Sequence, residues 1–516
     1  MTDGTPPVAV ALCDGTHGDA RLDPLTVVGF LADTVPGIPV EIVDDLCGRP
    51  EQIRDLVRAT GATRLVLGFC DRTFPRGEAQ AWSRKAGLDP FAVELVSLAF
   101  AAGSAVAAGK ILAAAVAAAR SFNGSEPEHL RTRFSDGPTS RRALFRLPPI
   151  TYEPAAAVDA NLCLGADRCG LCATACPVGA ITLEDRTIVD NRACVACGLC
   201  VSACPARAIT LPNASLDRYE AQVASLLSPT ADGRPRGLVL ACERTASALD
   251  GLGAAESWLT LELPCIGMIT PGWVLQALAA GAPAVALLPC RQECHPERTD
   301  PLDERVGYCR EVLELAGIEE AASLVRVLDP ADPGPLLEAV LAARVRGAAD
   351  STVVILSEPA ATADALLKLA GARAHRTPSL ERPGSPLGVV RIDHLACTAC
   401  GACATTCPTG ALTVAADEHE TALNLDPGAC LACERCVPAC PERAVTVRRE
   451  TDIAALARGP VVVKMDHVHG CVRCGRPVAP AAMLRRIRGL LADEPDALIR
   501  DLTELCGDCR AVSTHA

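Results

Sequence analysis

The chain has 516 residues, a formal net charge of −13, 28 cysteines and only 3% aromatic residues. At roughly 150 residues per domain, this length accommodates about three to five domains. The cysteines are too sparse for a small disulfide-stapled domain and too regularly spaced for chance, so we expect them to be ligands or reactive thiols. An acidic chain with few rings offers neither the basic surface nor the stacking platform of a nucleic-acid-binding protein.

The N-terminal segment, MTDGTPPVAVALC, has no basic flank and does not have the pattern of a cleaved secretory signal. We therefore expect a cytoplasmic location, where thiols stay reduced. The most apolar stretch, residues 91–119, contains Glu94 and Lys110 and is mostly alanine and glycine. It predicts a packed helix rather than a membrane span.

Two segments of the chain, residues 1–135 and 236–375, alternate apolar strand-like runs with helix-like stretches, which is the pattern of βαβ units. Each predicts a Rossmann-like domain with a parallel sheet. Strands in both segments run into a cysteine, giving the trios Cys13, Cys47, Cys70 and Cys242, Cys265, Cys290. Because the carboxyl ends of parallel strands share one edge of a sheet, each trio could converge there.

Residues 159–212 and 390–448 are dense in cysteine and are repeats of each other. The run Cys-x2-Cys-x2-Cys-x3-Cys-Pro occurs intact three times, beginning at Cys194, Cys397 and Cys430. Such a run wraps three thiolates around a 4Fe-4S cubane, and its fourth cysteine binds the neighbouring cluster. Every run is followed by a β-like tail, so each segment predicts a pseudo-twofold fold. Both segments resemble bacterial two-cluster ferredoxins over about 50 residues, an α+β fold.

The ferredoxin resemblance implies four cubanes with crossed ligand sets. In the second segment the sets are Cys397, Cys400, Cys403, Cys440 and Cys430, Cys433, Cys436, Cys407; in the first they are Cys163, Cys169, Cys172, Cys204 and Cys194, Cys197, Cys200, Cys176. The first run departs from the motif, because five residues separate Cys163 from Cys169. Either this loop bulges, or Cys163 is not a ligand and the cluster has three irons.

In the segment 236–375, Cys242, Cys265, Cys290 and Cys294 offer four thiolates that suit a 2Fe-2S cluster. The stretches LPCIGMITPGWVLQALAAGAPAVALLPCRQECHPE and VGYCREVLELAGI resemble the delta subunit of methyl-viologen-reducing hydrogenase. That resemblance implies a 2Fe-2S cluster and electron transfer between a redox enzyme and a heterodisulfide-reductase-like partner. The alternative is a set of inert buried cysteines, and we expect His295 to lie beside the site rather than in it.

The segment 1–135 resembles the N-terminal domain of the flavin-carrying component of heterodisulfide reductase, through VAVALCDGTHG, VDDLCGRP, VLGFCDRTF and AGLDPFAVELVSLAF. That family has a second cysteine where this chain has Gly15. A further cluster at Cys13, Cys47 and Cys70 would therefore need a fourth ligand, such as His17 or Cys309. The alternative is a structural domain that binds no cluster.

The tail, residues 460–516, contains Cys471-x2-Cys474 and Cys506-x2-Cys509, a spacing that predicts a closed, zinc-ribbon-like structural zinc site. An iron site is the alternative, and we expect His467 and His469 to be exposed. The tail resembles the C-terminal ends of ferredoxin-like proteins encoded beside molybdenum or tungsten formate dehydrogenases.

No Gly-x-Gly-x-x-Gly follows a strand and opens a helix, and no phosphate-binding loop is present, so we expect no flavin, no NAD and no nucleotide. No catalytic residue is predicted. The sequence favours a protein that carries electrons along iron-sulfur clusters between a hydrogenase-type or formate dehydrogenase-type oxidoreductase and an acceptor. Two alternatives remain open: a catalytic component of a heterodisulfide-reductase-like enzyme, and a redox-sensing interaction protein.

Overall fold

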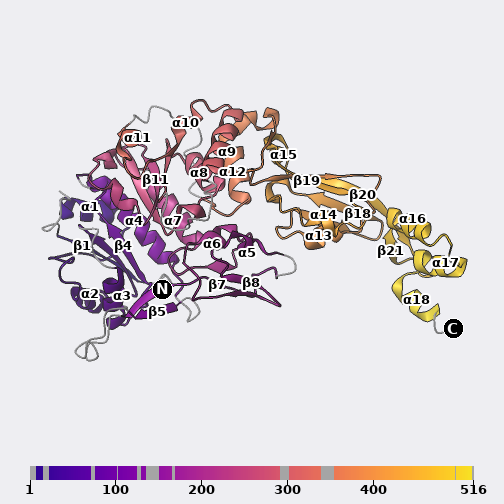
Figure 1. Cartoon of the computed structure of the whole chain (residues 1–516), viewed down its shortest axis with the longest axis horizontal. Helices are drawn as coiled ribbons and strands as arrows, with labels where there is room; N and C mark the ends of the chain where they lie inside the picture. Colours follow the sequence, from indigo (N-terminus) through magenta and orange to yellow (C-terminus); the bar gives the residue numbers. More distant parts are fainter. Residues whose placement is uncertain are drawn as a thin grey trace. The chain divides into compact units, whose positions relative to one another are not determined.

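The computed structural model describes residues 7–14, 22–70, 76–101, 103–124, 130–134, 150–165, 169–290, 302–338, 354–493 and 495–513. The chain divides into two compact units, residues 1–361 and 362–516 (Figure 1).

The first unit begins with a parallel sheet whose strands lie in the order β2-β1-β3-β4. The strands are β1 (Val8–Cys13), β2 (Val40–Val43), β3 (Arg64–Phe69) and β4 (Val93–Ser97). The helices between and after them are α1 (Pro24–Thr34), α2 (Gln52–Thr60), α3 (Arg76–Lys85) and α4 (Ala105–Ser121). Every residue of β1 is buried, which explains its uninterrupted apolar sequence.

The apolar stretch 91–119 does not form one helix, so that prediction is wrong for its first part. Residues Val93–Ser97 form the edge strand β4, and α4 begins only after Ser104, whose side chain accepts a hydrogen bond from the Ala107 amide at 3.3 Å. Ser104 is thus the N-cap that separates strand from helix. Among the residues that the structure describes, no helix has the length and apolarity needed to cross a membrane.

A second parallel sheet in the same unit has the order β12-β11-β13-β14, the topology of the first sheet repeated. Its strands are β11 (Gly237–Cys242), β12 (Trp258–Leu263), β13 (Val285–Leu288) and β14 (Val325–Val327). The helices of this part are α8 (Pro271–Ala279), α9 (Leu302–Leu315), α10 (Ala321–Leu324) and α11 (Gly334–Glu338), and α12 (Ala360–Ala370) follows. The two predicted parallel-sheet domains are confirmed, whereas their Rossmann-like classification stays a prediction.

The first cysteine-dense segment lies between these sheets in the sequence and consists of short elements. The antiparallel pairs are β7 (Ala157–Val158) with β10 (Ile209–Thr210) and β8 (Ile181–Leu183) with β9 (Thr187–Val189). The helices are α5 (Leu171–Ala175) and α6 (Leu199–Ala203). A further antiparallel pair, β5 (Leu130–Phe134) with β6 (Ile150–Pro154), precedes the segment.

Helix α7 (Leu216–Leu227) follows this segment and packs along α4, so it fixes the segment against the first sheet domain (Figure 1). Two buried polar groups hold this contact. The Lys110 ammonium donates to the Ser225 carbonyl at 3.1 Å and to the Ser228 hydroxyl at 2.8 Å, and Arg218 Nε donates to Glu94 Oε1 at 3.0 Å. Glu94 and Lys110, the two charged residues of the apolar stretch 91–119, therefore bind α7.

The second unit contains two antiparallel sheets, ordered β15-β19-β16 and β17-β18-β20-β21. The strands are β15 (Leu380–Glu381), β16 (Gly388–Ile392), β17 (Leu412–Ala416), β18 (Glu420–Leu425), β19 (Val445–Thr451), β20 (Val461–Gly470) and β21 (Pro477–Pro480). The helices are α13 (Ala402–Thr406), α14 (Cys436–Ala439), α15 (Ile453–Arg458), α16 (Ala481–Leu490), α17 (Asp496–Glu504) and α18 (Gly507–Ser513). Strand β20 of the tail pairs with β18 of the second cysteine-dense segment, a connection the sequence does not reveal.

Candidate iron-sulfur and metal sites

The second cysteine-dense segment brings its thiols together in two crossed sets. Burial raises the pKa of Cys403 to about 11, helped by the neighbouring charges of Cys400, Cys397 and, from the other run, Cys440. Burial likewise raises the pKa of Cys436 to about 12, helped by Cys430, Cys433 and Cys407. For Cys403 and for Cys436, the three thiols that raise the pKa most are thus two of its own run and the closing cysteine of the other run, which is the arrangement that two cubanes require.

The first cysteine-dense segment has the same crossed arrangement. Burial, followed by the charges of Cys169, Cys204 and Cys163, raises the pKa of Cys172 to about 11. Burial and the charges of Cys197, Cys194 and Cys176 raise the pKa of Cys200. Cys163 thus lies with the other thiols of its set despite the longer spacing, as the bulged-loop interpretation expects, although residues 166–168 of that loop fall outside the described residues.

Backbone amides are also aimed at the sulfur atoms. The amide four residues after the closing cysteine of a run donates to that sulfur: Ala180 to Cys176 at 3.2 Å, and Ala208 to Cys204 and Ala444 to Cys440 at 3.3 Å each. Such hydrogen bonds stabilise thiolates and tune the potential of a bound cluster. These buried thiols and their donors fit 4Fe-4S clusters.

The middle domain places its three described cysteines beyond the carboxyl ends of neighbouring strands. Cys242 ends β11, while Cys265 and Cys290 follow β12 and β13 by two residues. The Cys242 thiol lies 3.9 Å from the Pro264 carbonyl oxygen, and the Gly267 amide donates to Cys265 Sγ at 3.4 Å. Cys294 and His295 lie outside the described residues, so the predicted fourth ligand and its neighbour stay predictions. Four thiolates there would suit 2Fe-2S.

The four tail cysteines form one compact group. Their sulfur atoms all lie within 4.8 Å of one another, and the Cys474 and Cys506 sulfurs are 3.5 Å apart. Zinc–sulfur bonds of about 2.3 Å in a tetrahedron place the sulfurs about 3.8 Å apart, so the group fits zinc. A hydrogen bond from the Cys506 backbone is the main cause that lowers the pKa of Cys471 to about 6. His467 and His469 are exposed on β20.

The N-terminal trio converges at the edge of the first sheet, as the strand pattern predicts. The sulfur of Cys13 lies 3.6 Å from that of Cys47 and 3.5 Å from that of Cys70, and Cys47 and Cys70 are 3.5 Å apart. Of the two proposed fourth ligands, Cys309 alone lies among the described residues, and it is not part of this group. His17 is outside the described residues, and the buried Cys309 thiol on α9 lies 3.9 Å from the Pro271 carbonyl oxygen.

The first cysteine-dense segment touches the middle domain at two cysteine-bearing loops. A Cβ atom added to Gly198 would lie 2.3 Å from Met268 Sδ, and one added to Gly267 would lie 3.4 Å from Leu199 Cδ1. Gly198 and Leu199 stand between Cys197 and Cys200, whereas Gly267 and Met268 belong to the short helix η5 (Ile266–Met268) directly after Cys265. Two of the cysteine groups are therefore joined by direct loop packing.

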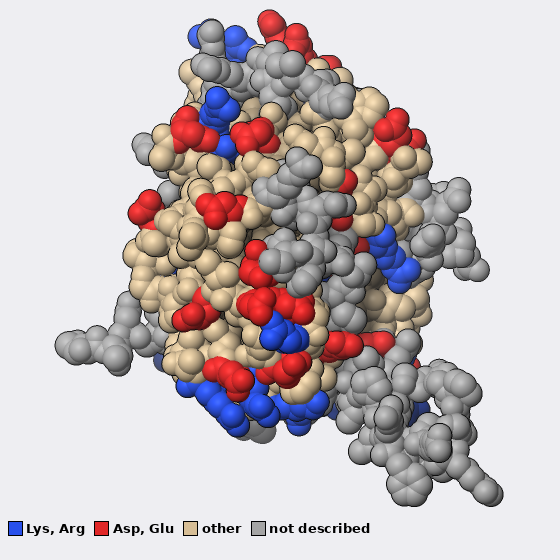
Figure 2. All heavy atoms as spheres, turned by 90° about the vertical axis from the view of Figure 1, so that its left-hand side faces the viewer, with Lys and Arg blue, Asp and Glu red and all other residues tan. Residues whose placement is uncertain are grey.

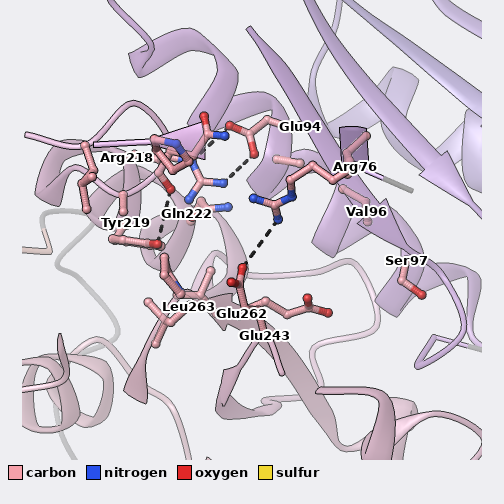
Figure 3. Close-up of a pocket in the computed structure, with 18 of the residues that line it drawn as sticks. Arg76, Glu94, Val96, Ser97, Arg218, Tyr219, Gln222, Glu243, Glu262 and Leu263 are labelled. Atoms are coloured by element: carbon pink, nitrogen blue, oxygen red, sulfur yellow. Dashed lines mark hydrogen bonds and ion pairs between the residues drawn. The ribbon is translucent and has the colours of Figure 1, made fainter. Parts of the chain in front are cut away.

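A cavity of about 780 Å³ lies beside this junction, and both Cys197 and Cys265 are among its lining residues. Figure 3 shows the charged side chains of this cavity. Its walls carry paired charges. Arg218 binds Glu94, and Arg76 from α3 points across the cavity toward Glu243, with 3.8 Å between Arg76 Nη2 and Glu243 Oε2. Burial raises the pKa of Glu243. The two cysteine loops therefore face a polar cavity. Polar groups near a cluster influence its reduction potential.

Comparison with protein families identifies three of these parts. Residues 162–208 and 396–444 each match the model of the 4Fe-4S dicluster domain, and residues 239–340 match that of the methyl-viologen-reducing hydrogenase delta subunit. No curated protein matches the chain. These matches confirm the predicted resemblances to two-cluster ferredoxins and to the delta subunit of the hydrogenase.

Proposed function

We propose that the chain is an electron-transfer protein, which relays electrons between a partner oxidoreductase of the hydrogenase or formate dehydrogenase type and an acceptor. Two 4Fe-4S dicluster domains and one domain similar to the hydrogenase delta subunit support electron transfer as its role. Bound iron-sulfur clusters would supply the one-electron chemistry. The chain itself contributes thiolates, amide donors to sulfur, burial and the spacing of the sites.

The proposed ligands follow the thiol groups of the structure. Four 4Fe-4S clusters would be held by the four crossed ferredoxin sets, a 2Fe-2S cluster by Cys242, Cys265 and Cys290 with Cys294, and zinc by the tail quartet. The family matches support the ferredoxin part of this assignment. The zinc part is supported by the spacing of the four tail sulfurs.

The observation that carries the proposal is the packing between the Cys197–Cys200 loop and the Cys265–Met268 loop. Electron tunnelling weakens steeply with distance, so two cluster sites exchange electrons faster where the loops that hold them pack against each other. Gly198 has no side chain, and this lets the backbone of one loop meet Met268 of the other. We infer that electrons pass between the first ferredoxin domain and the middle domain here.

Substitution of Gly198 by alanine tests this path. Its added methyl group would overlap the Met268 side chain, so the contact between the two loops must rearrange, and we expect severalfold slower electron exchange between the two domains. The measurement is freeze-quench EPR after anaerobic addition of about one electron equivalent of reduced methyl viologen, with the 2Fe-2S and 4Fe-4S signals followed separately.

The matched control is Gly401→Ala. Gly401 follows Cys400 in the second unit and has a φ of +78°, close to the +74° of Gly198, so alanine costs similar backbone strain at both positions. An added methyl there would lie 3.1 Å from Val414 Cγ2 and 3.9 Å from Val414 Cβ, within the second unit. Wild-type exchange in Gly198→Ala, with its full iron and sulfide content, would contradict the proposed path.

A further inference from the structure

We infer that Cys13, Cys47 and Cys70 bind a single divalent metal ion of the zinc type through three thiolates, rather than an iron-sulfur cluster. The inference does not depend on the proposed electron path. It starts from the three sulfur–sulfur distances in the first sheet domain, which all lie between 3.5 and 3.6 Å.

These distances suit one central ion. Three thiolates on the same tetrahedral ion, with bonds of about 2.3 Å, stand about 3.8 Å apart. In a cubane each thiolate binds its own iron, so the sulfurs are separated by the width of the cluster. Within the described part of the chain, only this trio and the tail quartet bring three or more potential ligand side chains within 4.8 Å of one another. The ferredoxin sets are more widely spaced, so the same structure distinguishes the two kinds of site.

The surroundings favour a bound cation. Cys13 and Cys70 are only 4% and 5% exposed and belong to an apolar core cluster that includes Leu46 and Phe69. Thiolates are stable in such surroundings only when a positive charge compensates them. Asp14 adds further negative charge, since its Oδ1 lies 3.8 Å from Cys13 Sγ and also accepts from the Asp45 amide at 3.4 Å. A divalent cation would neutralise about half of this negative charge.

The positions of the three cysteines in the fold also indicate a binding site rather than a chance contact. Cys13 is the last residue of β1, Cys70 directly follows β3, and Cys47 lies four residues after β2, so all three thiols stand at the carboxyl-end edge of the sheet, where open parallel sheets bind their ligands. Thiolates select soft metals, of which zinc accepts a three-thiolate set with a fourth donor. Among the described side chains, no carboxylate or imidazole joins the trio within 4.8 Å, so we assign only the three sulfur ligands.

The test counts zinc, iron and acid-labile sulfide in the anaerobically purified full chain and in two variants. We expect about two zinc ions per chain in the wild type, and about one in Cys47→Ser, with iron and sulfide unchanged. Cys474→Ser should also lose about one zinc, from the tail, and serves as the matched control. Loss of about four irons and four sulfides in Cys47→Ser would overturn the inference in favour of a cubane, and unchanged metal content would overturn it in favour of hydrogen-bonded thiols.

A second readout uses the unsubstituted chain, so it does not depend on the folding of a variant. Half-buried Cys47 and its two partners should resist alkylation until a zinc chelator is added, and all three should then become labelled together in peptide mass spectrometry. Cys309, a buried thiol outside the trio, should be labelled equally with and without the chelator. Labelling of the trio at the same rate in both conditions would show that no metal protects it.

Discussion

Single residues in left-handed conformations shape the cysteine loops. Ala196, Ala399 and Ala432 each have a φ of +54°, and each directly precedes the second cysteine of its run. A non-glycine residue in this region costs about 1–2 kcal/mol. All three runs adopt this unfavourable conformation at the equivalent alanine. We infer that the bend is needed to direct the amides and thiolates of the loop inward. Metal binding would stabilise a conformation that the bare chain disfavours.

A related turn follows the closing cysteine of each run. The third residue after that cysteine is left-handed in all four runs: Gly179, Arg207, Gly410 and Arg443. The turn brings the next amide onto the sulfur, as at Cys176, Cys204 and Cys440. Glycine occupies this position in the first run of each ferredoxin segment, and arginine occupies it in the second run.

Cys433→Ser tests the ligand assignment at the residue scale. We expect the variant to lose about four irons and four sulfides per chain, because one thiolate of the Cys430, Cys433, Cys436 and Cys407 set is removed. The circular dichroism of the two parallel-sheet domains should not change. Cys309→Ala, which removes a thiol outside these sets, is the control, and an undiminished iron count in Cys433→Ser would refute the assignment.

The ligand spacing of the cysteine runs already predicts the crossed thiol groups, because that spacing forces the loop, and their role as cluster ligands stays a prediction. The sequence predicts the N-terminal trio equally well, since strand ends and cysteines coincide in the sequence. It does not predict the spacing of those three sulfurs. That spacing depends on how the loops after β1, β2 and β3 pack, which no local pattern encodes.

At the scale of elements, the sequence fails where partners come from distant segments. Residues 93–97 resemble part of a helix because apolar periodicity cannot separate a buried strand from a buried helix. The pairing of β20 with β18 is likewise invisible in the sequence, although it attaches the tail to the second ferredoxin sheet. Both outcomes depend on tertiary contacts.

The tail quartet gives an element-scale prediction. In Cys474→Ser we expect loss of about one zinc and rapid proteolysis of α16, α17 and α18, because a closed zinc site stabilises its own fold. Cluster reduction should be preserved, since β20 remains paired with β18. Limited proteolysis with metal analysis measures this. Val472→Ser alters an exposed side chain between the two cysteines and should behave as wild type; loss of cluster reduction in Cys474→Ser would indicate a role beyond structure.

The contact between α4 and α7 predicts a pH dependence. Burial lowers the pKa of Lys110 from 10.5 to about 8, so the unfolded chain binds more protons than the folded chain between these values. The charged, buried lysine costs stability below pH 8, and this cost disappears as the pH rises toward 10. The melting temperature of Lys110→Met relative to wild type should therefore fall by a few degrees between pH 7 and 10.

Lys85→Met, which replaces an exposed lysine of α3, is the control for this pH series, because both variants remove one positive charge. Differential scanning fluorimetry at matched ionic strength provides the melting temperatures. A difference between Lys110→Met and wild type that stays constant across the range would show that Lys110 does not titrate in the folded chain.

At the scale of the molecule, the excess of acidic residues determines which donors approach easily. Figure 2 shows acidic side chains spread over the face at the left of Figure 1, with basic side chains gathered at its lower edge. Together with the net charge of −13, this surface would attract cationic donors and the basic patch of a partner protein.

Two small reductants of opposite charge test this property. The rate of cluster reduction by the methyl viologen radical cation should fall as salt rises from about 0.01 M to 1 M, because the screening length shrinks from about 30 Å to 3 Å. The rate with anionic dithionite should rise over the same range. Stopped-flow absorbance measures both rates. Identical salt dependence for the two donors would show that electrostatic attraction does not control the rate of cluster reduction.

The two parallel-sheet domains share one strand order and carry cysteines at equivalent strand ends, yet their loops hold the sulfur atoms differently. A duplicated domain whose loops later diverged would have this pattern, a common scaffold with separately specialised loops. Exchanging the three loops between the domains should then exchange their metal preference while both sheets persist. The chain would thus offer a natural pair of templates for engineering metal specificity by loop grafting.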